Sequence, residues 1–340
     1  MSRRSRGCGG CLVRSLLAII LLGAIGGASL YFYLARPYKG FQNETFIEIA
    51  KGTTTRGMAN QLARTGVIQS SWQFLLARAI RPSATLQAGE YRFAASSSVW
   101  TVYDRIARGD IFYYELTVPE GSNMFDIAAG IEHLGIIPAA DFLRAAQNPA
   151  MIHDIAPEAP TLEGYLFPST YRLTRHITAA EICKLMTETF RKQWRQLATH
   201  AQGKPVNQIV TLASLVEKET AVPAERPTVA GVYENRLRAG MALDCDPTTI
   251  YAALLEHRYR GTIYRSDLES LNPYNTYKHA GLPPGPIANP GAASLEAALA
   301  PAGTPYLYFV ARGDGSGGHR FSSTIEEHER AVQQYRRAQR

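Results

Sequence analysis

Two glutamates separated by one residue, Glu217 and Glu219, are the residues of this chain best suited to acid–base chemistry. They lie at the end of a segment, 208–220, whose large apolar residues recur at helical spacing. On such a helix Glu219 borders the apolar stripe near Leu215 and Val216, whereas Glu217 points further toward solvent. Burial disfavours ionisation and raises the pKa of a carboxylic acid toward the range of a general acid. The spacing therefore favours Glu219 as the acid, with a solvated Glu-Lys-Glu helix face as the alternative.

Other catalytic signatures are absent from the sequence. There is no Gly-x-Ser-x-Gly, no His-Glu-x-x-His and no glycine fingerprint of a dinucleotide-binding fold. The eight histidines are scattered, so neither a metal site nor a cofactor is expected. The glycine-rich run 313–318 is not followed by Gly-Lys-Ser/Thr, which argues against a phosphate-binding loop. No basic stripe marks the folded region, so nucleic acid is not an expected partner.

Several spaced motifs around the two glutamates resemble the endolytic murein transglycosylase (YceG-like) family. They are 162–171, 212–221, 230–237, 246–251, 274–277, 281–287 and 304–309, in the family's order. The resemblance covers nearly the whole chain, and it implies that the second glutamate of Glu-Lys-Glu, Glu219, is the catalytic residue. The family often has an acidic residue where this chain has Ser169, which leaves Glu163 as the nearby carboxylate.

The resemblance implies a lytic transglycosylase that cuts the MurNAc–GlcNAc β-1,4 bond of peptidoglycan. A glycosidase that adds water generally needs two carboxylates. A lytic transglycosylase needs one, because its glutamate protonates the leaving oxygen and then takes the proton of the sugar's own C6 hydroxyl, which closes a 1,6-anhydro ring. We expect this reaction to terminate nascent strands. A glycan hydrolase and a non-catalytic peptidoglycan-binding scaffold are the alternatives.

Eight further residues are candidates for contacts with the sugar, because carboxylates, amides and aromatic faces suit a ligand rich in hydroxyl groups. They are Glu163, Tyr171, Glu217, Asn235, Asp246, Thr248, Asn275 and Tyr277. Ordinary packing is the alternative for each tyrosine. The expected partners are the glycan strands themselves and the peptidoglycan synthases of the elongation or division machinery.

An uncharged apolar run, 15–35, precedes the folded region. As a helix rising about 1.5 Å per residue, it is long enough for a hydrocarbon layer of roughly 30 Å. Four of the charges that make the net charge +7 are arginines within 1–14, so the positive-inside rule makes this tail cytoplasmic. A cleaved signal peptide is the alternative, but its apolar region is shorter and ends in small residues, whereas this run ends in the aromatic residues 31–33. We expect a single-pass protein of the cytoplasmic membrane with its catalytic region outside.

The four cysteines divide by compartment. Cys8 and Cys11 form a C-x-x-C that lacks a second ligand pair, so it is a weak sign of a redox or zinc site. Their place beside the membrane suits reduced thiols or lipidation. Cys183 and Cys245 belong to the external part, where they either pair or remain buried free thiols.

An internal repeat follows the apolar run. Segments 49–68 and 118–137 share a strand that ends at a glycine, a helix and a second glycine, with Thr53 or Ser122 near the turn as the expected cap. Strand-helix-helix-strand units of this size resemble the LysM fold, a small glycan-binding module. We expect a LysM-like subdomain at 43–115, and a second copy that opens the catalytic region 116–340 and extends to about residue 150. Two packing units without a ligand are the alternative.

Longer helices dominate beyond about residue 175. The pattern predicts helices over 179–199, 207–220 and 228–239, a loop rich in proline and glycine over 272–291, and a hairpin over 306–321. A capping box at 323–326 predicts a C-terminal helix. The expected fold class is α+β: an N-terminal transmembrane helix, LysM-like α/β subdomains, and a mixed α+β catalytic domain.

Overall fold

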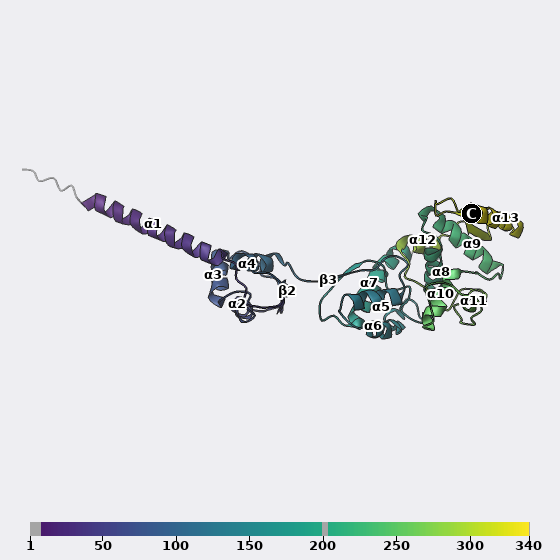
Figure 1. Ribbon diagram of the computed structural model, residues 1–340, viewed down its shortest axis with the longest axis horizontal. Helices are drawn as coiled ribbons and strands as arrows, with labels where there is room; N and C mark the ends of the chain where they lie inside the picture. The colour runs from purple at the N-terminus through teal and green to yellow at the C-terminus, as the bar shows by residue number, and fades with distance from the viewer. Residues whose placement is uncertain (1–7, 199–202, 340) are drawn as a thin grey trace, which may run out of the picture. The chain divides into compact units, whose positions relative to one another are not determined.

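The computed structural model describes residues 8–198 and 203–339 and divides the chain into two compact units, Met1–Tyr113 and Tyr114–Arg340, each with its own hydrophobic core (Figure 1). The described elements of the first unit are α1 (Cys8–Ala35), β1 (Thr45–Ile49), α2 (Thr55–Arg64), α3 (Ser71–Ile80), β2 (Gly89–Phe93) and α4 (Val99–Arg108).

The second unit mixes helices with short antiparallel strand pairs. Its described elements are β3 (Tyr114–Thr117), α5 (Met124–His133), α6 (Ala139–Ala146), η1 (Pro149–Ile152), β4 (Thr170–Leu173), α7 (Ala179–Leu197), α8 (Val206–Glu219), η3 (Pro223–Glu225), α9 (Arg226–Arg238), α10 (Asp246–Leu255), α11 (Arg265–Leu268), α12 (Ala292–Leu299), β5 (Tyr308–Ala311), β6 (His319–Ser322) and α13 (Ile325–Ala338). The strands pair as β1-β2, β3-β4 and β5-β6. The prediction of a mixed α+β fold is confirmed.

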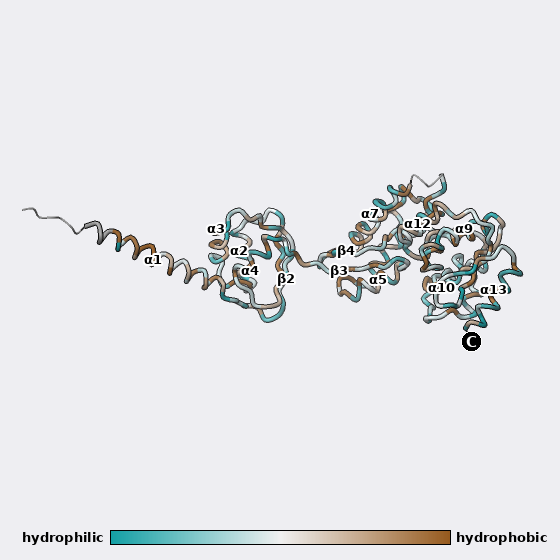
Figure 2. Tube along the Cα trace, turned by 90° about the horizontal axis from the view of Figure 1, so that it is seen from above, coloured by the Kyte–Doolittle hydropathy of each residue, from teal (hydrophilic) through white to brown (hydrophobic). Residues whose placement is uncertain are grey.

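Helix α1 contains the uncharged run predicted as a membrane span. Among the described residues, Val13–Ala35 is the one helix long and apolar enough to cross a membrane, and its apolar window is not buried within the structure (Figure 2). At its end, Leu34 is fully buried in the core of the first unit. Arg3, Arg4 and Arg6 lie outside the described residues, as do the side chains of Cys8 and Cys11.

The internal repeat is visible as two strand-helix-helix-strand units, β1-α2-α3-β2 and β3-α5-α6-β4, each closed by an antiparallel pair. The capping residues are one position later than predicted. Thr54, not Thr53, accepts from the backbone of Gly57. Asn123, not Ser122, accepts from the first turn of α5. In the first unit the Thr53 hydroxyl donates instead to the Ala50 carbonyl within the glycine turn, which leaves the cap to the next residue.

Helix α8 forms the centre of the second unit, where it packs against α9, α10 and α12. Every residue from 209 to 216 is buried, so only the ends of the helix reach solvent. The helix ends at Glu219 because Thr220 adopts an extended backbone, with φ −135° and ψ 128°. The carboxyl of Glu219 is therefore held at the negative end of the helix dipole, which disfavours its ionisation.

Three local predictions are settled in the second unit. The capping box of the last helix uses Thr324 and Glu327, one position after the predicted 323–326, and the helix begins accordingly at Ile325. Cys183 and Cys245 are both buried and free, so they do not form a disulfide. The loop 272–291 contains no helix or strand, as its proline and glycine content predicted.

Candidate active site

Glu219 opens onto a polar cavity of about 350 Å³ within the second unit. The end of α8, α9, the start of α10, the 272–291 loop, the β5–β6 hairpin and α13 all contribute to its wall. The lining residues are Glu219, Arg236, Leu243, Asp244, Asp246, Tyr277, Phe309, Val310, Ala311, His319 and His328. Segments far apart in the sequence thus meet around one carboxylic acid.

The surroundings of Glu219 favour its protonated form. Burial is the largest effect and raises the pKa of its carboxyl, and the nearby charge of Asp246 acts in the same direction. The hydroxyl of Tyr233, on α9, donates to Glu219 Oε1 at 2.9 Å and opposes this rise, as does the Cys245 thiol. The net effect is a raised pKa on a side chain that remains partly exposed. Such a group can deliver a proton to a ligand in the cavity.

Asp246 and Tyr277 are the two predicted sugar contacts that line the same cavity as Glu219. The hydroxyl of Tyr277 donates to Asp246 Oδ1 at 2.7 Å, and 38% of Tyr277 remains exposed. This pair connects the start of α10 to the proline- and glycine-rich loop. Both residues are placed to meet a ligand bound against Glu219.

Glu163 differs from the prediction that it contacts the sugar, because it is fully buried in the protein and does not line the cavity. Its Oε2 accepts from the backbone nitrogen of Met124 at 2.9 Å and from the Tyr251 hydroxyl at 3.0 Å. Its Oε1 accepts from Asn289 Nδ2 at 2.7 Å. Burial raises its pKa to about 8. A group with no exposed surface cannot contact a sugar, so Glu163 holds the start of α5 to the core instead.

Glu217 is also placed differently from the prediction, since its side chain is only 6% exposed. Oε1 pairs with Arg226 Nη2 at 3.2 Å, and Oε2 accepts from the backbone nitrogen of Gly291 at 2.9 Å. The helical pattern pointed this residue toward solvent, but Arg226 at the start of α9 and the 291 segment cover it. Glu217 is therefore a structural ion pair that does not line the cavity.

The four remaining candidates bond to other parts of the protein and do not line the cavity. The Tyr171 hydroxyl donates to the Phe167 carbonyl, and the Thr248 hydroxyl lies 2.9 Å from that of Thr276. Asn235 Nδ2 donates to the carbonyls of Thr304 and Tyr306. Asn275 Nδ2 donates to three carbonyls, those of Asp267, Leu268 and Ser270. Three of them are buried and Asn235 is partly so. They shape the loops around the site and none of them lines the cavity, so a contact with the sugar stays a prediction for these four.

Sequence reasoning missed three groups at the site: Tyr233, Cys245 and His319. Tyr233 belongs to the 230–237 motif and follows Glu219 on the next helix, so its proximity depends on how α8 and α9 pack. His319 comes from the hairpin and reaches the site through tertiary structure alone. Among the described residues, no three His, Cys, Asp or Glu gather closely enough to hold a metal ion.

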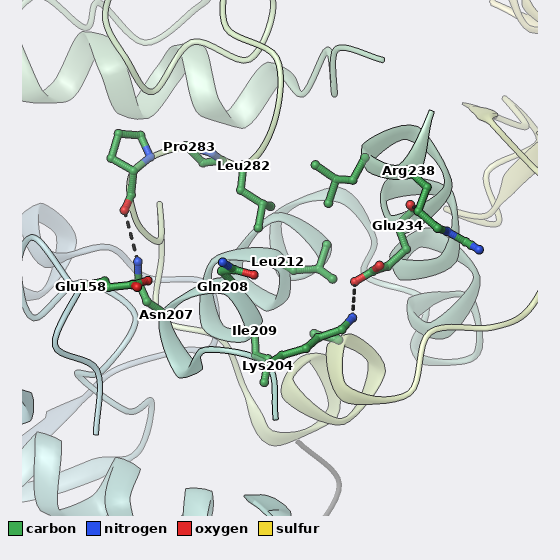
Figure 3. A pocket seen from close by; sticks show the side chains of 13 residues that line it. Glu158, Lys204, Asn207, Gln208, Ile209, Leu212, Glu234, Arg238, Leu282 and Pro283 are labelled. Carbon is green, nitrogen blue, oxygen red and sulfur yellow. Dashed lines mark hydrogen bonds and ion pairs between the residues drawn. The ribbon is translucent and has the colours of Figure 1, made fainter. Parts of the chain in front are cut away.

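A second cavity, of about 590 Å³, lies elsewhere on the unit (Figure 3). Lys204 and Glu234 form an ion pair of 2.7 Å in its wall, and Asn207 Nδ2 donates to the Pro284 carbonyl at 3.2 Å. None of the predicted site residues lines this cavity. Of its two carboxylates, Glu234 is paired with Lys204 and Glu158 is exposed, so neither is a shielded acid like Glu219.

A partly exposed carboxylic acid with a raised pKa, placed in a polar cavity, defines the class of enzymes that use general acid–base catalysis. Residues 47–334 match the YceG-like family, and the chain belongs to that family. A Bacillus subtilis (strain 168) relative named endolytic murein transglycosylase is 32% identical over 336 residues, 92% of this chain and 91% of the relative.

Two further comparisons agree with this assignment. A Streptococcus pneumoniae relative, also named endolytic murein transglycosylase, is 27% identical over 85% of this chain and 58% of its own length. A crystal structure of a yceG-like protein from Listeria monocytogenes superposes with a TM-score of 0.58 and 31% identity, covering 85% of this chain and 99% of that one.

Proposed function

We propose that this protein is an endolytic murein transglycosylase that cuts the MurNAc–GlcNAc β-1,4 bond and leaves 1,6-anhydro-MurNAc ends. The observation that carries the proposal is Glu219, a carboxylic acid with a raised pKa at the wall of a polar cavity. The relatives that bear this name align with most of the chain.

One carboxylic acid can serve both halves of the reaction. Protonated Glu219 gives its proton to the leaving O4 as the bond between C1 and O4 breaks. The resulting carboxylate then takes the proton of the C6 hydroxyl as O6 bonds to C1, which regenerates the acid. The Tyr233 hydroxyl, 2.9 Å from Oε1, stabilises the carboxylate between the two steps. An intramolecular nucleophile needs no positioned water.

A glycan hydrolase is the second candidate, because Asp244 and Asp246 also line the cavity. A second carboxylate could activate a water molecule, as in inverting glycosidases. However, Asp246 accepts from Tyr277, and Asp244 pairs with Arg236 Nη1 at 3.2 Å. Both carboxylates thus have protein partners, which favours the single-acid mechanism.

The anchor and its orientation are part of the proposal. We place 1–14 in the cytoplasm, 15–35 across the cytoplasmic membrane as a single span, and the catalytic region 116–340 outside, where peptidoglycan lies. The apolar, unburied helix Val13–Ala35 supports this placement. The first strand-helix-helix-strand unit, 43–115, would act as a LysM-like glycan-binding module, with a second copy at about 116–150.

The biological role follows from endolytic cutting close to the membrane. An enzyme tethered there meets glycan strands as they are made, so we propose that it terminates nascent strands beside the peptidoglycan synthases. A non-catalytic scaffold built on the LysM-like units is the remaining alternative.

Mass spectrometry of digested glycan strands tests the proposal. The full chain in detergent should produce shorter strands with anhydro ends, which lack one water relative to reducing ends. Reducing ends would show a hydrolase instead. Strands that bind without being shortened would support the scaffold.

A further inference from the structure

Glu225 and His319 form an acid–histidine pair at the edge of the Glu219 cavity. His319 Nδ1 lies 2.8 Å from Glu225 Oε2, and the His319 backbone nitrogen donates to both carboxylate oxygens, at 2.9 and 3.1 Å. The side chain of His319 is only 11% exposed and that of Glu225 only 13%. Glu225 ends η3 and His319 begins β6, so the pair is assembled by the fold.

The pairing determines what the other ring nitrogen can do. The carboxylate beside Nδ1 accepts a hydrogen bond from an N–H at that nitrogen. In neutral His319 the single ring proton is therefore on Nδ1, and Nε2 carries the lone pair. Nε2 makes no hydrogen bond with any described residue. It is also not buried, because it is absent from the set of buried polar atoms that lack a partner. Since His319 lines the cavity, Nε2 is available as an acceptor for a ligand there.

The ring is also held in a fixed relation to Glu219. Phe309 packs edge-on against His319, with centroids 5.4 Å apart, and edge-on against Tyr233 at 6.0 Å. Tyr233 is the residue whose hydroxyl donates to Glu219. His319 is close enough to Glu219 that its protonated form would lower the pKa of that carboxyl. One phenyl ring therefore packs against both His319 and the tyrosine that donates to Glu219.

We propose that His319 is a further substrate-contacting residue, whose Nε2 accepts a hydrogen bond from a hydroxyl of the sugar bound against Glu219, and that Glu225 is its positioning residue. The inference rests on the proposed function for the identity of the sugar. The competing explanation is structural: the pair only fastens the β5–β6 hairpin to η3, with Arg312 Nη2 nearby at 3.9 Å from Glu225.

Two substitutions separate these explanations, because asparagine places its amide near the position of Nδ1 and glutamine near that of Nε2. His319→Asn keeps the bond to Glu225 and loses the contact with the sugar. His319→Gln does the reverse. The proposal expects His319→Asn to lower kcat/KM by about 10-fold, mainly through a higher KM, and His319→Gln to retain more activity. A structural role predicts the opposite order, and that result would overturn the proposal.

A measurement without catalysis completes the test. In full-chain Glu219→Gln protein labelled with ¹⁵N-histidine, addition of purified glycan strands should shift the Nε2 signal of His319. The exposed His153 serves as the matched control and should not shift. An unmoved His319 signal with bound glycan would refute the contact. A shifted signal in a protein whose wild type cuts no glycan would keep the contact and reject the proposed reaction.

Discussion

Glu163 is fully buried and Glu219 partly buried in the same unit, and burial raises the pKa of both. Glu163 has no exposed surface, and three donors occupy its two oxygens. Glu219 receives one protein hydroxyl and opens onto a cavity. A raised pKa therefore reports burial, and access to a ligand is what separates a catalytic acid from a structural one. Substitutions of the two glutamates and of their neighbours test whether access to a ligand, and not burial, makes Glu219 the catalytic acid.

Glu219→Gln should produce the largest effect, a loss of glycan-cutting activity of about 10³-fold. Glutamine keeps the size of the side chain and can still accept from Tyr233, but it cannot donate and recover a proton. The measurement is the rate of appearance of new strand ends. Glu217→Gln is the matched control two residues away, since it affects an ion pair with Arg226 that lies outside the cavity. If Glu217→Gln lost activity while Glu219→Gln kept it, the assignment would be wrong.

Glu163→Gln should lower stability and leave the chemistry intact. The NH₂ group of glutamine cannot accept a hydrogen bond, so at least one of the three donors loses its partner. A buried donor without a partner costs about 1–3 kcal/mol. Urea unfolding followed by the fluorescence of Trp194, in a chain with Trp72 and Trp100 replaced by phenylalanine, would measure the loss. Activity per folded molecule should change less than about twofold. A stable variant without activity would contradict the structural role.

The pH dependence of stability sharpens the same comparison. The folded pKa of Glu163, about 8, lies above its ordinary value of 4.5. The protonated group therefore contributes stability that is fully present below about pH 4.5 and is lost as the pH rises through about 8. Wild-type unfolding free energies should fall over this window, and those of Glu163→Gln should fall less steeply. Parallel curves for the two proteins would exclude Glu163 as the titrating group.

Tyr233→Phe should have a moderate effect on Glu219. The lost hydroxyl stabilises the carboxylate, so its removal raises the pKa of Glu219 further, by at most about one unit for a bond of about 0.5–1.5 kcal/mol. Because the acid must be protonated to act, the high-pH limb of the kcat/KM profile should shift to higher pH. The maximum value of kcat/KM should fall several-fold. Tyr165→Phe removes a buried hydroxyl that bonds Asn207, away from the cavity, and should leave this limb unmoved.

Local patterns predicted much of the fold, because capping residues, glycine turns and apolar spacing act over a few residues. The sequence predicted α8 as 207–220, and the structure has Val206–Glu219. The placement of Glu163, Glu217 and Asn275 could not be predicted in this way. Their partners are distant in the sequence or belong to irregular loops, and a buried polar network has the same residue types as a sugar-binding surface. His319 was missed for the same reason, since only the tertiary fold brings it beside Glu219.

Ser169→Asp should have the smallest effect, although it introduces the acidic residue that the family resemblance leads us to expect at this position. Ser169 is exposed just before β4, where its carbonyl accepts from the Val118 backbone nitrogen, and it does not line the cavity. A carboxylate there faces water, so stability should change by no more than about 0.5 kcal/mol and the rate by less than about twofold. A marked gain in kcat would show that a carboxylate at 169 acts on the ligand. Glu219 would then no longer be sufficient as the one acid of the site.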